Sequence, residues 1–319
     1  MSLKYFTPKN TPLEACGSWN KSHYLLDEDT AYALEMALLT KRPLLVKGEP
    51  GLGKSYLARA AATQLKRAFI SEVINLNTEA QDLLWKTDPI ARLNDAQLKL
   101  KKEQELHPKH YINPGILWWA FDWETAFTQY DEICHHSIYK PQTIDEEQRK
   151  NGIVLLIDEI DKADPSLPNS LLEVLGNGGF EVPECEQTIG NKTNKEAPQP
   201  LVIITTNDER ELPPAFVRRC LVLHLKVDED NIEKWLMERA DVHISNTDCS
   251  PTVKLEAAKQ LKKDRESAKK QGMTKAGLSE YLDLLTALKE MTQEHSGEAK
   301  EMAQLKLLKK IKHFALCKA

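Results

Sequence analysis

The stretch Gly48-Glu49-Pro50-Gly51-Leu52-Gly53-Lys54-Ser55 decides the fold, because it matches the pattern GxxxxGK[ST] at every fixed position. An apolar run at 43–47 precedes it and a helical pattern at 54–66 follows, so the sequence predicts a strand, a glycine-rich loop and a helix. Such glycines let backbone N–H groups turn inward around phosphate oxygens, and the amino end of the helix adds positive potential. Lys54 is expected to contact the β- and γ-phosphates of a nucleotide, and the Ser55 hydroxyl to bind Mg²⁺. The residues expected to bind the nucleotide are Glu49, Pro50, Gly51, Leu52, Gly53, Lys54, Ser55 and Tyr56.

Two carboxylates follow a second apolar run. Ile153–Ile157 is typical of a buried strand, and Asp158 and Glu159 come directly after it. Because ligands bind at the carboxyl ends of parallel strands, we expect Asp158 to hold Mg²⁺ and Glu159 to polarise an attacking water. The period of two along a strand predicts that Glu159 points to the face opposite Asp158. Solvated acids that only cap the strand are the alternative, which the phosphate-loop pattern disfavours.

Two further stretches carry polar groups suited to the same chemistry. The apolar run Leu201–Thr205 leads to Asn207, whose amide can orient water or touch a γ-phosphate, or can simply open the following turn. Downstream, Arg218 and Arg219 lie at the end of a short predicted helix. They either cap the negative end of that helix or reach the nucleotide of a neighbouring subunit, where an arginine raises the rate by roughly 10³–10⁵.

The order of elements indicates an α/β domain followed by a helical one. Short apolar runs alternate with helical stretches up to about residue 225, which is typical of a parallel sheet. Four helical segments follow it, at 230–240, 252–271, 278–291 and 298–316. We therefore predict a five-stranded parallel sheet flanked by helices in a domain over residues 1–227, and a small all-helical domain over 228–319. The polar stretches 94–110 and 184–199 are expected to be loops or hairpins that project from the sheet.

Composition excludes several classes of protein. The 319 residues are 41% hydrophobic and 29% charged, and no apolar run approaches the ~20 residues that span a bilayer. The start lacks the apolar core of a secretory signal, which predicts a cytoplasmic protein without membrane contact. Six scattered cysteines form no CxxC pair, which argues against a zinc ribbon or a disulfide framework. The net charge of −5 is uneven, since residues 251–319 carry 15 Lys/Arg against nine Asp/Glu.

The motifs together resemble AAA+ ATPases, and specifically their MoxR-like (dynein-related) branch. The resemblance rests on GEPGLGKS, LLIDEIDKAD, IITTND and LPPAFVRRC, and covers roughly residues 25–290. It implies strand order 5-1-4-3-2, a helical lid, Mg-ATP bound at subunit interfaces of a ring (a hexamer), and Arg219 as the arginine that acts in trans, with Arg218 as an adjacent candidate. It also implies an insert near 94–116 and a hairpin near 180–200. Many such lids carry an arginine near the start of their third helix, where this sequence has Lys275.

The resemblance implies an ATP-hydrolysing, chaperone-like machine that remodels a protein client, commonly beside a partner with a von Willebrand A-type domain. The alternative is a nucleic-acid-associated or defence-system motor. In that case the basic segment with Lys306, Lys309, Lys310 and Lys312 would bind phosphates and Trp118, Trp119 and Trp123 would stack on bases, although a core patch of tryptophans is favoured. A GTPase is a third reading, for which the nearest guanine-reading pattern is Asn191-Lys192-Thr193-Asn194.

Overall fold

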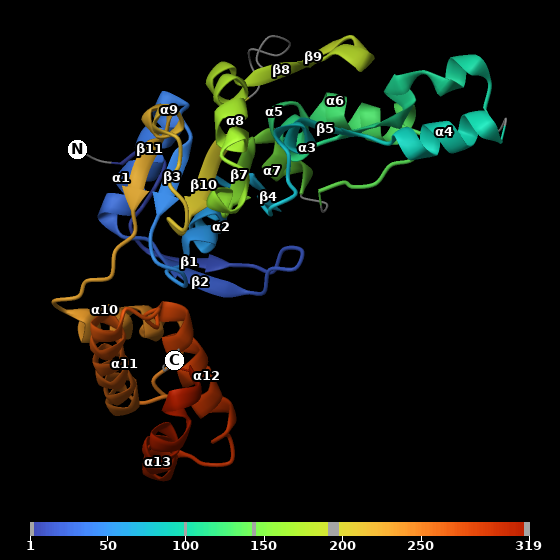
Figure 1. Ribbon diagram of the computed structural model, residues 1–319. Coiled ribbons are helices and arrows are strands. Elements are labelled where there is room, and N and C mark those ends of the chain that lie inside the picture. Colours follow the sequence, from blue (N-terminus) through green and yellow to red (C-terminus); the bar gives the residue numbers. More distant parts are fainter. Residues whose placement is uncertain (1–2, 99–100, 142–144, 191–197, 316–319) are drawn as a thin grey trace. The chain divides into compact units, whose positions relative to one another are not determined.

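Five buried apolar runs form one sheet in the structure, a computed structural model that describes residues 3–98, 101–141, 145–190 and 198–315. The strands are β3 (Leu44–Lys47), β4 (Ala68–Val73), β7 (Ile153–Asp158), β10 (Leu201–Thr206) and β11 (Leu221–His224). Their spatial order is β11-β3-β10-β7-β4 (Figure 1), which is the predicted order 5-1-4-3-2. The registers of β3, β10, β7 and β4 are parallel, so the predicted five-stranded parallel sheet is confirmed.

The central strands are buried on both faces, which explains why they read as continuous apolar runs rather than as alternating ones. All six residues of β10 are buried, as are Ile153–Ile157 of β7. Helices cover such a sheet because each must bury its own apolar stripe. The first of the chain's two compact units contains α1 (Glu28–Thr40) and α8 (Ser166–Asn177), together with the predicted helices α2 (Lys54–Leu65), which it shares with the second unit, and α9 (Pro214–Arg219).

The described chain divides into two compact units. The first comprises Met1–Thr7, Glu28–Lys47 and Ala58–Leu223, and the second comprises Pro8–Asp27, Gly48–Leu57 and His224–Ala319. The glycine-rich loop therefore belongs to the same unit as the C-terminal helices and the hairpin of β1 (Asn10–Leu13) and β2 (Ser22–Leu25). Sequence analysis did not predict this hairpin. The domain bounds 1–227 and 228–319 stay a prediction.

The second unit contains the four helices expected after residue 227. They are α10 (Ile232–His243), α11 (Pro251–Gln271), α12 (Leu278–Glu290) and α13 (Gly297–Ala315). Leu278, Leu285 and Leu288, which repeat at helical spacing, are buried in the core of this unit. The predicted all-helical segment is thus confirmed.

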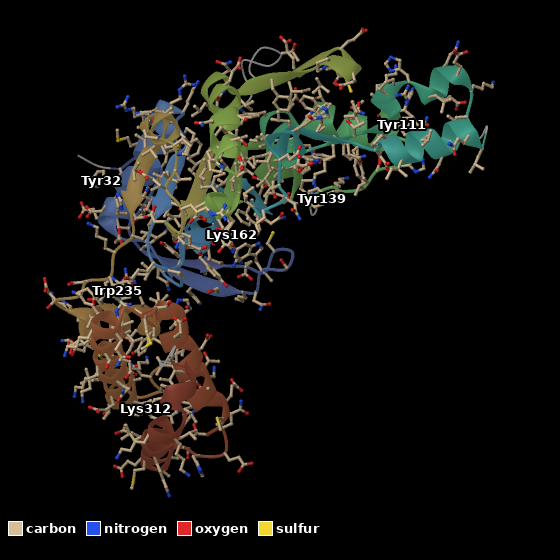
Figure 2. The ribbon with its side chains drawn as sticks, in the orientation of Figure 1. Tyr32, Tyr111, Tyr139, Lys162, Trp235 and Lys312 are labelled. Carbon is tan, nitrogen blue, oxygen red and sulfur yellow. The ribbon has the colours of Figure 1, made fainter. Side chains whose placement is uncertain are left out.

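The segment between β4 and β7 is a helical insert in the first unit, and its helix α4 (Pro89–Gln97) lies far from the sheet (Figure 1). The stretch 94–110, expected as a loop or hairpin, instead holds the end of α4 and two 3-10 turns, η1 (Glu103–Leu106) and η2 (Pro108–Tyr111). Tyr111, labelled in Figure 2, is fully buried and donates its hydroxyl to Asp95 Oδ2 at 2.9 Å. The other elements of the insert are α3 (Ala80–Leu84), β5 (Trp85–Thr87), α4 (Pro89–Gln97), β6 (Ile112–Pro114), α5 (Ile116–Phe121), α6 (Trp123–Thr128), η3 (Gln129–Ile133) and α7 (Glu146–Lys150).

Two sequence predictions about this region have clear outcomes, and a third cannot be compared with the structure. Trp118 and Trp119 are fully buried in the core and cannot stack on bases, as the favoured core reading predicts. The hairpin predicted near 180–200 is β8 (Gly179–Val182) paired antiparallel with β9 (Gln187–Gly190), joined by the turn η5 (Pro183–Cys185). The guanine-reading candidate 191–194 lies outside the described residues. Among the described helices, none is long and apolar enough to cross a membrane.

Lys254 of α11 is a buried charge whose removal should destabilise the second unit. Its side chain is fully buried, and its Nζ donates to Ile244 O at 2.6 Å, Asp241 Oδ1 at 2.7 Å and Asn246 Oδ1 at 2.9 Å. We expect Lys254→Met to lower the free energy of unfolding by about 3 kcal/mol, because a buried carbonyl and a carboxylate lose their donor. Urea unfolding followed by circular dichroism measures this.

Lys259→Met on the same helix is the matched control. Lys259 pairs with Glu256, and both side chains are 47% exposed. This substitution should cost less than about 1 kcal/mol, as is usual for exposed pairs. Equal costs for the two variants would contradict a structural role for the buried lysine.

Candidate functional site

The glycine-rich loop needs its glycines for steric reasons. Gly51 and Gly53 have φ of +77° and +83°, which L side chains rarely adopt. A Cβ on Gly51 would lie 2.3 Å from Ser279 Oγ, and one on Gly48 would lie 2.6 Å from Leu225 O. The backbone of the loop also meets α12 directly, since Ser279 N donates to Gly51 O at 3.2 Å. Only glycine fits these positions.

Lys54 and the residues after it open helix α2. The Lys54 Nζ donates to Gly48 O at 2.7 Å and to Glu49 O at 3.0 Å, and only 7% of the residue is exposed. The amino group is thus folded back into the loop, where two backbone carbonyls accept its hydrogen bonds. These carbonyls can give up the amino group when a phosphate binds. Ser55 lies in the first turn of α2, and the Tyr56 ring packs edge-on against Trp19 at a centroid distance of 5.6 Å. A loop of this kind, with a helix amino end and a lysine inside it, fits a nucleotide phosphate.

Glu49 of the loop is held by two cations, Arg265 on α11 and Lys275 in the connection between α11 and α12. Arg265 Nη2 donates to Glu49 Oε2 at 2.8 Å and Lys275 Nζ to Glu49 Oε1 at 3.2 Å. Arg265, on α11, is only 3% exposed and also contacts Glu229 Oε1 at 2.6 Å and Ala276 O at 2.7 Å. Sequence analysis noted Lys275 but missed Arg265, because nothing in the helical pattern of α11 distinguishes one basic residue from its neighbours.

This cluster changes the ionisation of Glu49. Partial burial opposes the charged form, but hydrogen bonds and charges from Arg265 and then Lys275 outweigh it and hold the pKa of Glu49 below its ordinary value. Contact with these two cations therefore favours the ionised form of Glu49 over the protonated one.

The acidic end of β7 lies against β10 within the first unit. Asp158 is the last residue of β7, and its Oδ1 accepts a short hydrogen bond from Thr205 Oγ1. The same hydroxyl oxygen accepts the backbone N–H of Glu159 at 2.9 Å. Thr205, buried in β10, therefore holds both acidic residues in place.

The backbone of Glu159 does not continue the strand, so the alternation on which its predicted direction rested does not extend to this residue. Its φ and ψ are +60° and +49°, the left-handed region, so the chain has left the strand and begins the turn η4 (Ile160–Lys162). Period-two reasoning stops where the extended backbone stops. The aim of the Glu159 side chain is set by this turn instead.

The Glu159 carboxylate accepts hydrogen bonds from two side chains. Asn207 Nδ2 donates to Glu159 Oε1 at 3.2 Å, so the structure brings together these two predicted residues. Lys162, labelled in Figure 2, donates to Glu159 Oε2, and this hydrogen bond raises the pKa of the lysine. Lys162 was not predicted, although its spacing of three from Glu159 in a 3-10 turn would have placed it on the same side.

Asp161 is a third residue that sequence analysis missed. It is 2% exposed, and its Oδ2 accepts the backbone N–H groups of Asn207 at 3.2 Å and Glu209 at 2.9 Å. These bonds fix the turn after β10 and thereby the position of the Asn207 amide. Asp161 thus positions Asn207 rather than reacting itself.

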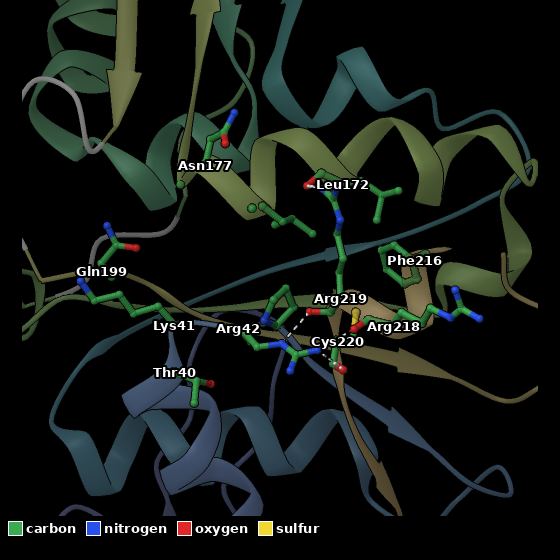
Figure 3. Close-up of a pocket in the computed structure, with 14 residues that line it drawn as sticks. Thr40, Lys41, Arg42, Leu172, Asn177, Gln199, Phe216, Arg218, Arg219 and Cys220 are labelled. Atoms are coloured by element: carbon green, nitrogen blue, oxygen red, sulfur yellow. Dashed lines mark hydrogen bonds between the residues drawn. The ribbon is translucent and has the colours of Figure 1, made fainter. Parts of the chain in front are cut away.

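Arg218 and Arg219 occupy the other edge of the sheet. They end α9, directly before β11, and both side chains are exposed on a cavity of about 840 Å³ (Figure 3). Arg219 Nη1 donates to Leu172 O of α8 at 3.1 Å. Because the strands are parallel, their amino ends lie together on one side of the sheet and their carboxyl ends on the other. The amino end of β11 is therefore on the side opposite Glu159 and Asn207. A six-residue strand is about 20 Å long, so the structure does not bring these arginines to the acidic end of their own unit.

The sequence of the chain matches one family over more than half of its length. The AAA domain of the dynein-related subfamily matches residues 43–220, which span the loop, the acidic strand end, Asn207 and both arginines. The chain belongs to this family of AAA domains, and it is an ATPase.

Solved structures give a distant likeness. A mutant form of RuvB from Thermotoga maritima aligns with 14% identity and a TM-score of 0.47, covering 88% of this chain and 67% of that one. RuvB of the same organism, described as a Holliday junction branch migration motor, aligns with 17% identity and a TM-score of 0.42 over 89% and 67% of the chains. A Cytophaga hutchinsonii protein whose name as an ATPase is provisional shares 13% identity with a TM-score of 0.38 over 90% and 80%. Among curated proteins, no sequence matches.

Removing the charge of Glu49 should change how stability depends on pH. A carboxylate with a lowered pKa contributes stability that is present above its unfolded pKa, ordinarily 4.5, and is lost as pH falls through the folded value. We expect Glu49→Gln to lower the melting temperature at pH 7, and the gap from the unchanged protein to close below pH 4.5. Thermal unfolding at several pH values measures this.

The control is Glu266→Gln, which removes an exposed carboxylate from the same helix as Arg265. It should leave the melting temperature close to that of the unchanged protein over the whole range. A gap for Glu49→Gln that stays constant down to pH 4 would show that the ion cluster does not stabilise the loop.

Proposed function

We propose that this ATPase binds Mg-ATP at its glycine-rich loop and uses hydrolysis to remodel a protein client, as a ring-forming, MoxR-like AAA+ machine. The observation that carries the proposal is the Glu159 carboxylate held by Asn207 at the carboxyl edge of the sheet, with Arg218 and Arg219 at the opposite edge. A hydrolytic base in one place and a charge-stabilising group out of its reach fit catalysis that is shared between subunits.

The loop is assigned the phosphates. Glycine backbone N–H groups and the amino end of α2 attract phosphate oxygens, and Lys54 adds a full positive charge next to Gly48 and Glu49. The Ser55 hydroxyl and the Asp158 carboxylate are hard oxygen ligands of the kind that Mg²⁺ takes. When bound, Mg²⁺ neutralises phosphate charge and so lowers the barrier to attack on the γ-phosphorus.

Glu159 is assigned to the attacking water. A carboxylate oxygen accepts a proton from water as the new oxygen–phosphorus bond forms, which makes the water a better nucleophile. Asn207 donates to Oε1 of Glu159, so it orients the base. A group that displaces this hydrogen bond would change the position of both side chains. Lys162 neutralises part of the charge of Glu159 before a nucleotide is present.

Arg218 and Arg219 are assigned to the nucleotide of the next subunit. Exposed guanidinium groups at the amino edge of the sheet are available to a neighbouring copy, where they would stabilise charge that develops on the γ-phosphate. Lys275, which contacts Glu49, is proposed to take the place of the lid arginine found in many relatives. A hexameric ring is the arrangement that the family resemblance supports.

Substitution of the base should separate binding from turnover. We expect Glu159→Gln to reduce kcat by at least about 100-fold while ATP affinity stays within a factor of two, because the amide keeps the size of the side chain but accepts no proton. Steady-state phosphate release and binding of a fluorescent ATP analogue measure the two quantities. Glu147→Gln, on the exposed helix α7, is the control, and normal hydrolysis by Glu159→Gln would sink the assignment of the base.

The client can be trapped with the same variant. In the presence of ATP, Glu159→Gln should retain a protein partner, among which partners with a von Willebrand A-type domain are expected, because the ATP-bound state persists. Lys54→Ala, which removes the charge that holds the phosphates, should not retain it. Affinity capture followed by mass spectrometry compares the two, and identical protein sets from both variants would count against nucleotide-dependent remodelling.

A further inference from the structure

Arg42 makes an arrangement of hydrogen bonds that none of the motifs predicts. It lies between α1 and β3, is half-buried, and is distant in sequence from the end of α9. Its Nη2 donates to Arg218 O at 2.6 Å and to Cys220 O at 3.1 Å, and its Nε donates to Arg219 O at 3.1 Å. Figure 3 shows the guanidinium under the end of α9, beside the three carbonyls.

These three carbonyls need a partner. The last carbonyl groups of a helix receive no N–H donor from within the helix. The helix α9 is also only six residues long, too short to be stable alone. A planar guanidinium spreads its donors over three nitrogens in a fixed fork and so reaches several neighbouring carbonyls at once, whereas the three donors of an ammonium group all radiate from one nitrogen on a flexible stem. Arg42 therefore fixes the direction in which the final turn of α9 presents its side chains.

Two further contacts complete the support of α9. Phe216 is fully buried in the core of the first unit, and Arg219 Nη1 donates to Leu172 O. Phe216 anchors the buried face of α9, and the Arg219 side chain ties its last turn to α8. Arg42 binds the backbone carbonyls at its carboxyl end. The backbone of the following residue is tied to the sheet as well, because Leu221 N donates to Pro43 O at 2.8 Å.

We propose that Arg42 is a positioning residue for catalysis in trans: it locks the carboxyl end of α9 so that Arg218 and Arg219 reach the nucleotide of a neighbouring copy. The inference rests on the proposed function of these two arginines. Arg42 itself uses its donors on backbone carbonyls and does not touch the reacting atoms. Because a misplacement of about 1 Å can cost about 100-fold in rate, loosening this helix end should reach the chemistry from a distance.

Lys41 provides a matched comparison. It is the neighbouring residue and lines the same cavity, which is bordered by Lys41, Arg42, Arg218 and Arg219 and, among the described residues, by no carboxylate. If Arg42 acted only by adding positive charge to this surface, Lys41→Gln and Arg42→Gln would have similar effects. If Arg42 acts through the carbonyls of α9, only Arg42→Gln will have a large one.

The first experiment measures steady-state ATP hydrolysis, ATP affinity and melting temperature for Arg42→Gln, Arg42→Lys and Lys41→Gln. For Arg42→Gln we expect kcat to fall about 10- to 100-fold with KM and ATP affinity unchanged. For Arg42→Lys, which keeps the charge but donates from a single nitrogen instead of a planar fork, kcat should fall less. Lys41→Gln should keep the kcat of the unchanged protein. A kcat for Arg42→Gln equal to that of Lys41→Gln would overturn the proposal.

A mixing experiment separates positioning from a general structural defect. Arg42→Gln keeps its own base but presents displaced arginines, whereas Glu159→Gln lacks the base but presents correctly held arginines. Mixed rings should therefore hydrolyse ATP faster than either variant alone, at sites where an Arg42→Gln subunit meets a Glu159→Gln neighbour. Size-exclusion chromatography with light scattering shows that the mixed species have assembled. If Arg42→Gln is inactive and mixing restores nothing, the positioning role is overturned.

Arg218→Gln/Arg219→Gln distinguishes failure of this inference from failure of the proposed function. If the double variant hydrolyses ATP normally, the role of the arginines in trans is wrong. If the double variant is inactive and is rescued by mixing while Arg42→Gln is fully active, only the role of Arg42 is overturned. Should Arg42→Gln fail to fold, Arg42→Lys carries the same test: a several-fold loss that mixing reverses is expected, and normal kcat contradicts the proposal.

Discussion

The parallel pairing of β7 with β10 is the constraint on which the rest of the catalytic edge depends. Ile157 lies opposite Ile204 in this register, so the residues that follow each strand emerge side by side. The Thr205 hydroxyl then reaches Asp158, and the Asn207 amide reaches Glu159. A slip by a single residue would turn each side chain to the other face of the sheet and separate all four groups. The continuous burial of both strands makes such a slip costly.

Much of this arrangement could be predicted from the sequence, because strands that are buried on both faces consist of uninterrupted apolar residues. The runs at Ile153–Ile157 and Leu201–Thr205 gave both strand positions and, through the rule that ligands bind at carboxyl ends, the neighbourhood of Asp158, Glu159 and Asn207. The helices after residue 227 could also be predicted from the sequence; along α12, for example, leucines repeat at helical spacing. Local pattern and tertiary structure agree at all these places.

What escaped prediction depends on contacts between residues that are distant in sequence or on backbone geometry within a turn. Arg265 is one basic residue among several on α11, and only the fold shows that it is buried against Glu49 and Glu229. Asp161 looks like another acid in an acidic stretch until its bonds to the turn after β10 are seen. The period-two argument did not apply to Glu159, because the left-handed backbone at that residue has already left the strand.

The contacts of Arg42 with the end of α9 also have a consequence for the order in which the chain folds. They join residues 176 to 178 positions apart, so they close a very long loop. Loop closure of this length has an entropic cost that local helix formation does not, and contacts of such separation slow folding. During synthesis the partner carbonyls emerge only after most of the first unit has left the ribosome. The arginine-bearing helix end therefore acquires its final geometry late, after the strands between β3 and β11 have been made, so a nascent chain has its phosphate loop long before it has a completed surface for a neighbour.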